Sequence, residues 1–240
     1  MDNKQIIDKE VRNVKMSFVG YTRSLALCSN MNYETENLDF IDRIKEGENY
    51  YDLGACEGRF SLYAALKGIP TISFEPEKLN FSAFIENIQI NELAENKILK
   101  PYHLGVGEKN QKATMKIGQP WAGGHQKVVD YKETRADLSF DFTDEQNIDI
   151  ISLDAFIEEN KLSPPIYMKV DIDGSEMPFL IGAEQTLSRS SLKAILFELS
   201  NLDPKYDEII SFLTKCGLIA TEHFQVPNEP NLFNILFERK

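Results

Sequence analysis

From about residue 49 onward, short apolar segments alternate with segments of helical periodicity, and this alternation restricts the fold more than any other feature. Such alternation predicts a parallel sheet with helices on both faces. Strands are expected at 49–53, 71–74, 98–104, 113–117, 148–152, 166–170, 194–199, 218–224 and 232–238. Helices are expected at 59–66, 78–91, 153–160, 176–187 and 204–216. Only a short loop separates the last two strands, so they should form an antiparallel C-terminal hairpin.

Two parts of the chain depart from the alternation. Residues 1–46 are predicted to be a helical N-terminal extension that serves as a lid or as part of an acceptor site, with a second helix at 38–44. The helical spacing at its start comes from Ile6, Ile7, Val11 and Val14. Residues 118–147 have no sustained period and are predicted to be mostly an inserted loop in a single α/β domain that spans 47–240.

The composition of the chain restricts the cellular compartment and the binding partners that we expect. The net charge of −12 argues against nucleic acid as a partner, because phosphate backbones require clustered Lys and Arg. Cys28, Cys56 and Cys216 are scattered, which predicts neither a disulfide framework nor a zinc site and suits a reducing compartment. The charged N-terminus lacks the apolar stretch of a secretory signal, and no apolar run is long enough to cross a membrane. We therefore expect a cytoplasmic location.

The strongest local motif is the turn between the strand at 49–53 and the helix that follows it. A dinucleotide-binding turn would have glycines at the positions of Cys56 and Arg59, so the NAD pattern fails. Asp52, followed by Gly54 and Gly58, would repel a pyrophosphate but suits a zwitterionic ligand that carries a sulfonium. The alternative is a glycine turn that joins strand to helix and binds no ligand.

Acidic residues also follow the next strands. Glu75 lies roughly 20 residues after the glycine turn, the spacing at which a carboxylate reaches ribose hydroxyls, although it could instead be a solvated loop carboxylate. Asp171 leaves the strand at 166–170, where the carboxyl ends of strands line the ligand crevice, and Glu198 is expected at the same edge or exposed beyond it. Asp173 and Glu176 can also be interpreted as a helix-capping pair.

Together these motifs resemble the FkbM family of methyltransferases over roughly residues 49–199. The resemblance rests on the following residues: Asp52-Leu53-Gly54-Ala55-Cys56-Glu57-Gly58, Phe74-Glu75-Pro76, Asn87, Asn91, Ser152-Leu153-Asp154, Lys169-Val170-Asp171-Ile172-Asp173-Gly174-Ser175-Glu176, Leu180, Gly182, Ala183 and Glu198. Cys56 stands where the family most often has Asn, and Asp173 where it most often has Glu.

The resemblance implies a Rossmann-like class I fold with a mainly parallel seven-stranded sheet, and transfer of a methyl group from S-adenosylmethionine to oxygen, often on a sugar or glycan. The expected cofactor-binding residues are Asp52, Gly54, Ala55, Cys56, Gly58, Glu75, Pro76 and Asp171.

A hydroxyl acceptor needs a base. We expect Asp171 in this role, with Glu198 second and His125 as a loop candidate, and no metal site, although these carboxylates could alternatively bind a divalent cation. Trp121 would either stack on a sugar face or pack in the core. The expected partner is a small-molecule or glycan acceptor, and a homo-oligomer is compatible with the sequence. Two rival functions are an NAD-type sugar-modifying enzyme and a non-catalytic module that binds S-adenosylmethionine.

Overall fold

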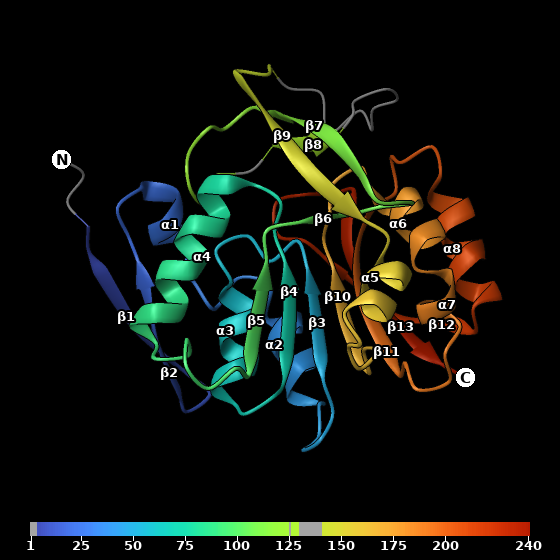
Figure 1. Cartoon of the computed structure of the whole chain (residues 1–240), viewed down its shortest axis with the longest axis horizontal. Helices are drawn as coiled ribbons and strands as arrows, with labels where there is room; N and C mark the ends of the chain where they lie inside the picture. Colours follow the sequence, from blue (N-terminus) through green and yellow to red (C-terminus); the bar gives the residue numbers. More distant parts are fainter. Residues whose placement is uncertain (1–3, 125, 130–140) are drawn as a thin grey trace.

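The computed structural model describes residues 4–124, 126–129 and 141–240. Its largest element is a seven-stranded sheet with the order β12-β13-β11-β10-β3-β4-β5 (Figure 1). The parallel strands are β3 (Tyr50–Leu53), β4 (Thr71–Phe74), β5 (Leu99–Tyr102), β10 (Tyr167–Val170) and β11 (Ala194–Ser200). The C-terminal antiparallel hairpin consists of β12 (Leu218–Gln225) and β13 (Leu232–Arg239). These strands lie where the sequence predicts them.

Helices cover both faces of this sheet, and each face has its own hydrophobic core. One face carries α2 (Thr35–Asp42), α3 (Arg59–Leu66) and α4 (Lys78–Ile90). The other carries α5 (Leu153–Glu159), α6 (Glu176–Gly182), α7 (Glu184–Leu187) and α8 (Tyr206–Lys215). The single helix predicted at 176–187 is thus two helices. In the described part of the chain, no helix has the length and apolar character needed to cross a bilayer.

The prediction of a helical N-terminal extension is wrong at its start. Residues 6–19 form an antiparallel hairpin of β1 (Ile6–Val11) and β2 (Val14–Val19), and helices follow only at α1 (Arg23–Cys28) and α2. Arg12 and Asn13 adopt φ angles of 48° and 66°, the left-handed conformation that a tight two-residue hairpin requires. The β-branched residues that suggested a helical period are at least as well suited to strands.

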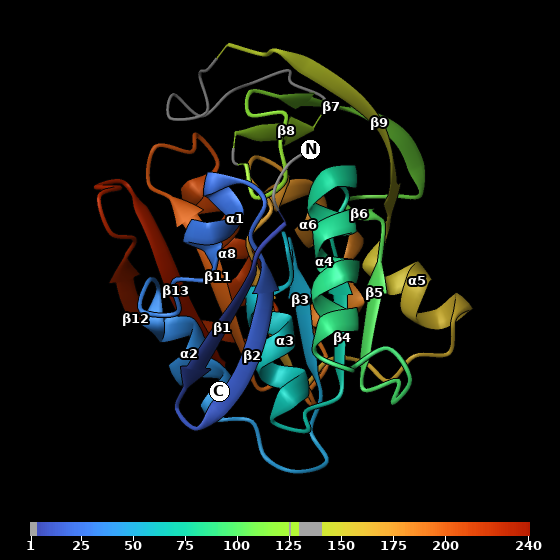
Figure 2. The same ribbon diagram turned by 90° about the vertical axis from the view of Figure 1, so that its left-hand side faces the viewer.

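The described residues of the inserted segment include strand residues, at 127–129 and 144–147, where the sequence predicted mostly loop. A second, four-stranded sheet has the order β6-β9-β7-β8, and it uses residues from both ends of the expected loop at 118–147. Its strands are β6 (Gly105–Val106), β7 (Gln111–Ile117), β8 (Lys127–Val129) and β9 (Asp144–Ile151). The first half of β9 is polar and gives no strand signal by itself; pairing with β7 organises it. Figures 1 and 2 both place this sheet over the carboxyl ends of the parallel strands.

The glycine turn between β3 and α3 lies beneath this cover. Gly54 has a φ of 79°, and a Cβ atom at this position would lie 1.7 Å from the carbonyl oxygen of Asp171. Gly58 has a φ of 87°, and its Cβ would lie 2.0 Å from the ring of Phe84. Both glycines therefore let neighbouring parts of the chain approach each other closely, whether or not a ligand also uses the turn.

We predict that Gly54→Ala lowers the free energy of unfolding by about 3 kcal/mol or more, because a backbone carbonyl cannot move away from the added methyl. Gly68→Ala is the matched control: Gly68 has a φ of 84°, but a Cβ added there would have no neighbouring atom within 4 Å. Gly68→Ala should lower the free energy of unfolding by only about 1 kcal/mol, which is the cost of placing alanine in a left-handed backbone conformation. Urea unfolding of both variants measures the difference, and equal losses would contradict the packing role.

Candidate active site

Asp52, expected at the cofactor, lies inside the protein with 1% of its surface exposed. Its Oδ2 accepts a hydrogen bond of 2.5 Å from the Ser61 hydroxyl on α3. Its Oδ1 is buried without a hydrogen-bond partner among the described residues and lies 3.8 Å from Nζ of Lys169. Burial raises the pKa of Asp52, and the Lys169 charge opposes that shift. The carboxylate therefore faces a buried cation and not the surface.

Lys169, on β10, connects this interior carboxylate to the edge of the sheet. Its side chain is 5% exposed, and Nζ donates a hydrogen bond of 3.0 Å to Oδ2 of Asp171, whose side chain is 34% exposed. Burial by itself lowers the pKa of Lys169, but Asp171 and Asp52 together raise it above its usual value. Lys169 is therefore a permanent cation shared by one buried and one accessible carboxylate.

Strand register places Glu198 beside Asp171. Val170 pairs with Phe197, and the Asp171 amide donates to the Leu53 carbonyl, so the parallel pairing extends to the strand ends. Asp171 directly follows β10, and Glu198 lies within the adjacent parallel strand β11, one residue beyond the partner of Val170. Burial raises the pKa of Glu198 well above its usual value, and the nearby Asp171 charge adds to the effect. This arrangement favours the neutral form of Glu198 more than in an ordinary glutamate, whereas the Lys169 charge favours the charged form of Asp171.

The N-terminal segment contributes an ion pair that the sequence did not reveal. Arg59, the first residue of α3, has its Nη2 3.0 Å from Oε2 of Glu34, and both side chains are largely buried. Burial raises the pKa of Glu34; the Arg59 charge opposes this and the Asp171 charge reinforces it. Glu34 and Arg59 thus belong to the same electrostatic group as the two strand-end carboxylates. No local motif marks Glu34, because only the tertiary fold brings it here.

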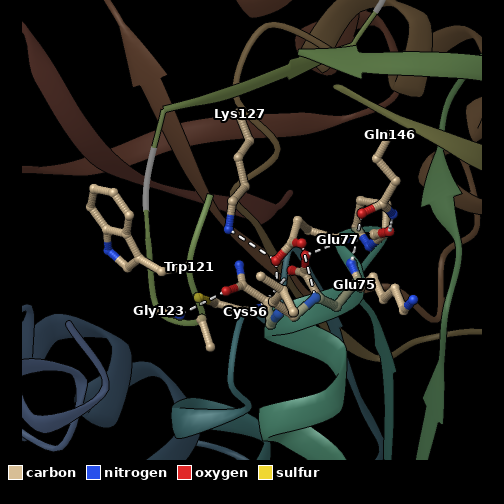
Figure 3. Close-up of polar contacts among 12 residues, drawn as sticks. Cys56, Glu75, Glu77, Trp121, Gly123, Lys127 and Gln146 are labelled. Carbon is tan, nitrogen blue, oxygen red and sulfur yellow. Dashed lines mark hydrogen bonds and ion pairs between the residues drawn. The ribbon is translucent and has the colours of Figure 1, made fainter. Parts of the chain in front are cut away.

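Glu75 follows β4 and holds the glycine turn against the start of α4 (Figure 3). Its Oε2 accepts a hydrogen bond of 2.8 Å from the Cys56 amide, and its Oε1 accepts one of 2.8 Å from the Glu77 amide. The residue is 5% exposed, which rules out the solvated-loop alternative. Burial raises the pKa of Glu75 to about 7, although Lys127 and the two amides oppose the shift.

Side chains of the second sheet contact the segment between β4 and α4. Lys127, on β8, forms an ion pair of 3.1 Å with Glu77, which also caps α4 through the Leu79 and Asn80 amides (Figure 3). Gln146, on β9, donates to the Pro76 carbonyl at 3.0 Å. The second sheet is therefore bound to the protein next to Glu75 and Pro76.

The loop between β7 and β8 contacts the N-terminal segment. The Trp121 indole donates a hydrogen bond of 2.8 Å to the Ser24 hydroxyl, and the Thr22 hydroxyl donates one of 3.0 Å to the Ala122 carbonyl. Trp121 remains 42% exposed, so the alternative of core packing is wrong. His125, the loop candidate for a base, lies outside the described residues.

The capping interpretation of the motif after β10 is only partly right. The N-cap residue of α6 is Ser175 and not Asp173. Glu176 is 2% exposed and accepts a hydrogen bond of 3.0 Å from the Gly174 amide, as a residue that supports the turn would. Within the described ranges, no group of three or more His, Cys, Asp or Glu side chains has an arrangement that could hold a metal ion.

Comparisons with known proteins agree with this architecture. The family model of the methyltransferase FkbM domain matches residues 52–219. The precorrin-6y C5,15-methyltransferase of Geobacter metallireducens GS-15 has a TM-score of 0.51 at 8% identity, covering 97% of this chain and 94% of that chain. Sp1610 of Streptococcus pneumoniae, in complex with S-adenosyl-L-methionine, has a TM-score of 0.50 at 11% identity, covering 86% and 73%. At these identities the similarity shows the Rossmann-like α/β fold alone. No curated protein matches the sequence.

We predict that Lys169→Met lowers the free energy of unfolding by about 3–5 kcal/mol, because it leaves the buried Asp52 carboxylate without its cation. Lys112→Met is the control, since Lys112 is 82% exposed in its ion pair with Asp149 and should contribute at most about 1 kcal/mol. Adding Asp52→Asn to Lys169→Met should recover part of the loss. Chemical denaturation measures all three variants, and a Lys169→Met protein as stable as the control would refute the role of Lys169.

Proposed function

The chain belongs to the FkbM methyltransferase family, and on that premise we propose that it is an O-methyltransferase that modifies a hydroxyl of a sugar or glycan. The observation that carries the proposal is the pair of carboxylates on adjacent parallel strands, Asp171 after β10 and Glu198 within β11, with Lys169 bonded to the first. This pair offers an accessible, ionised carboxylate at the edge where ligands of open α/β sheets bind.

The acidic side chains at this edge of the sheet suit S-adenosylmethionine as a ligand. The ligand is an adenosine with a vicinal diol and a positively charged sulfur, and when bound it supplies an activated methyl group. Glu75 would accept hydrogen bonds from the ribose hydroxyls beside Pro76, since a carboxylate has lone pairs beyond the two that the Cys56 and Glu77 amides use. Asp171 and Glu198 would face the positive sulfur. Asp52 would act through Lys169, because its own carboxylate is buried.

Asp171 is proposed as the base. It would accept the proton of the acceptor hydroxyl as the oxygen is methylated, and alignment of the two reactants would supply much of the remaining acceleration. Glu198, held as a neutral acid, would donate a hydrogen bond that orients the acceptor. The proposal for this second role follows from the raised pKa of Glu198.

The acceptor is proposed to bind between the N-terminal segment and the second sheet, which meet at Trp121 and Ser24. An indole ring with a fixed hydrogen bond and an exposed face suits the apolar face of a sugar. The net charge of −12 favours a neutral or cationic acceptor over nucleic acid. We also propose that the enzyme is located in the cytoplasm.

Calorimetry with S-adenosylmethionine, S-adenosylhomocysteine and NAD, followed by a methyl-transfer screen over sugar and glycan acceptors, tests the proposal. We expect binding of the first two ligands, none of NAD, and methylation of a hydroxyl. Binding without transfer to any acceptor would favour a non-catalytic module, and binding of NAD alone would favour the rival enzyme class.

We predict that Asp171→Asn retains affinity for S-adenosylmethionine within a few fold but lowers turnover about 100-fold or more, because the base is lost. Glu198→Gln keeps a neutral hydrogen-bond donor and should lower turnover less than about tenfold. Single-turnover rates with radiolabelled methyl donor separate binding from chemistry. A Glu198→Gln variant more impaired than Asp171→Asn would reverse the two roles.

We predict that affinity for S-adenosylmethionine rises from about pH 5.5 to about pH 7 and then levels off. Burial raises the pKa of Glu75 to about 7, so at lower pH a proton must leave before the carboxylate can accept both ribose hydroxyls. Glu75→Gln should bind more weakly and lack this part of the pH dependence. Calorimetric titrations across the range measure both proteins, and identical pH profiles would exclude Glu75 as the ribose ligand.

A further inference from the structure

A buried ion pair links the second sheet to the segment between β4 and α4. Nζ of Lys127, on β8, lies 3.1 Å from Oε2 of Glu77, and the two side chains are only 10% and 3% exposed. By contrast, Lys116 pairs with Glu145 inside the second sheet, and those side chains are 36% and 62% exposed. Because a buried charge is costly unless it is paired, the position of Lys127 is more constrained than that of the surface lysine.

Glu77 in turn holds Glu75, the proposed ribose ligand. The Glu77 carboxylate accepts hydrogen bonds of 2.9 and 2.7 Å from the Leu79 and Asn80 amides, which fix it at the start of α4. The Glu77 amide donates a hydrogen bond of 2.8 Å to Oε1 of Glu75. Figure 3 shows this series of contacts from Lys127 through Glu77 to Glu75. A displacement of Glu77 would therefore move the Glu75 carboxylate with it.

Uncharged groups of the second sheet and its loop contact the same segment. Gln146, on β9, donates a hydrogen bond of 3.0 Å to the Pro76 carbonyl. The Gly123 amide, in the loop before β8, donates one of 2.8 Å to the Asn80 side chain. Loss of the Lys127 charge alone would leave these contacts in place, so the effect of the charge can be measured separately from the docking of the sheet.

Charged and titratable groups reach Glu75 from three elements: Lys127 from β8, Glu77 from the start of α4 and Cys56 from the glycine turn. Burial and the Glu77 charge raise the pKa of Glu75, whereas the Lys127 charge and the amides of Glu77 and Cys56 lower it. Of the groups that oppose burial, Lys127 has the largest effect. Without Lys127, two acids would share a buried site with only amides to stabilise their charges, and Glu75 would take up a proton at higher pH.

We propose that Lys127 is a positioning residue of the donor site, which through its ion pair with Glu77 holds the Glu75 carboxylate ready for the ribose hydroxyls of S-adenosylmethionine. The second sheet, which lies over the carboxyl ends of the strands in Figures 1 and 2, is thereby coupled to donor binding. By reciprocity, a bound donor should favour the position that β8 has in this structure. The role in donor binding rests on the proposed function, whereas the effect of Lys127 on Glu75 does not.

The first experiment measures Glu75 without any ligand. Glutamate carboxyl groups are labelled with carbon-13, and the Glu75 resonance is assigned with Glu75→Gln. We expect Lys127→Gln, which removes the charge but keeps a hydrogen-bond donor for Glu77, to raise the midpoint of the Glu75 titration by about one pH unit. Lys127→Arg should restore the midpoint of the wild type, and Lys116→Gln should leave it unchanged. An unchanged midpoint in Lys127→Gln would overturn the proposal.

A second variant tests the same charges without a change at Lys127. Glu77→Gln removes the acid that competes for the lysine and leaves the Lys127 charge to Glu75 alone. It should therefore lower the midpoint of the Glu75 titration below that of the wild type. A higher midpoint in Glu77→Gln would contradict the assignment of Lys127 as the cation that stabilises Glu75.

The last experiment tests the consequence for the donor. Calorimetry compares binding of S-adenosylhomocysteine to the wild type, Lys127→Gln and Lys127→Arg at each pH, so that titration of the ligand itself cancels. We expect Lys127→Gln to bind about fivefold more weakly at pH 7 and to come within about twofold of the wild type at pH 8.5, with Lys127→Arg close to the wild type throughout. Equal weakening at both pH values would indicate a merely structural role and overturn the coupling. Failure of the wild type to bind would instead count against the proposed function.

Discussion

A buried lysine between two carboxylates is the interaction on which the proposed site depends. Lys169 is in hydrogen-bond contact with Asp171 and close to the buried Asp52, and burial reduces the screening of these charges by solvent. Without the cation, burial and mutual repulsion would drive the carboxylates to take up protons. Lys169 favours the charged form of Asp171 at the edge of the sheet, while the pKa of the half-buried Glu198 is raised by desolvation and by the nearby Asp171 charge. The buried cation thus lies beside one of the two acids, and the charge of that acid raises the pKa of the other.

The strand order of the large sheet brings these charged residues together at one edge. The strands β3, β10 and β11 are adjacent and parallel, so the glycine turn after β3, Asp171 after β10 and Glu198 within β11 come from neighbouring strands although they are far apart in sequence. The second sheet and the N-terminal segment then cover that edge from two directions and meet at Trp121. The proposed reaction centre is therefore built on rigid strands, and the parts that differ most from the strand–helix alternation surround it.

The sequence predicted those features that depend on local pattern. Alternating strands and helices, the C-terminal hairpin, the acidic residues within β3 and β11 and those directly after β4 and β10 all follow from short-range periodicity and turn chemistry. The failures have a common cause. The polar first half of β9 becomes a strand only by pairing with β7, and Ile6 to Val14 fit a strand hairpin once Arg12 and Asn13 form its turn. Glu34 reaches Arg59 and the site only through long-range packing, which no spacing in the sequence encodes.

The most direct test of the central claim is a crystal structure of the protein with S-adenosylhomocysteine. We expect the ribose hydroxyls to lie on the Glu75 carboxylate and the sulfur to face Asp171, with Lys169 still bonded to the Asp171 carboxylate. A ligand bound with its sulfur remote from Asp171 and Glu198, or with its ribose away from Glu75, would contradict the assignment of this edge as the site of methyl transfer.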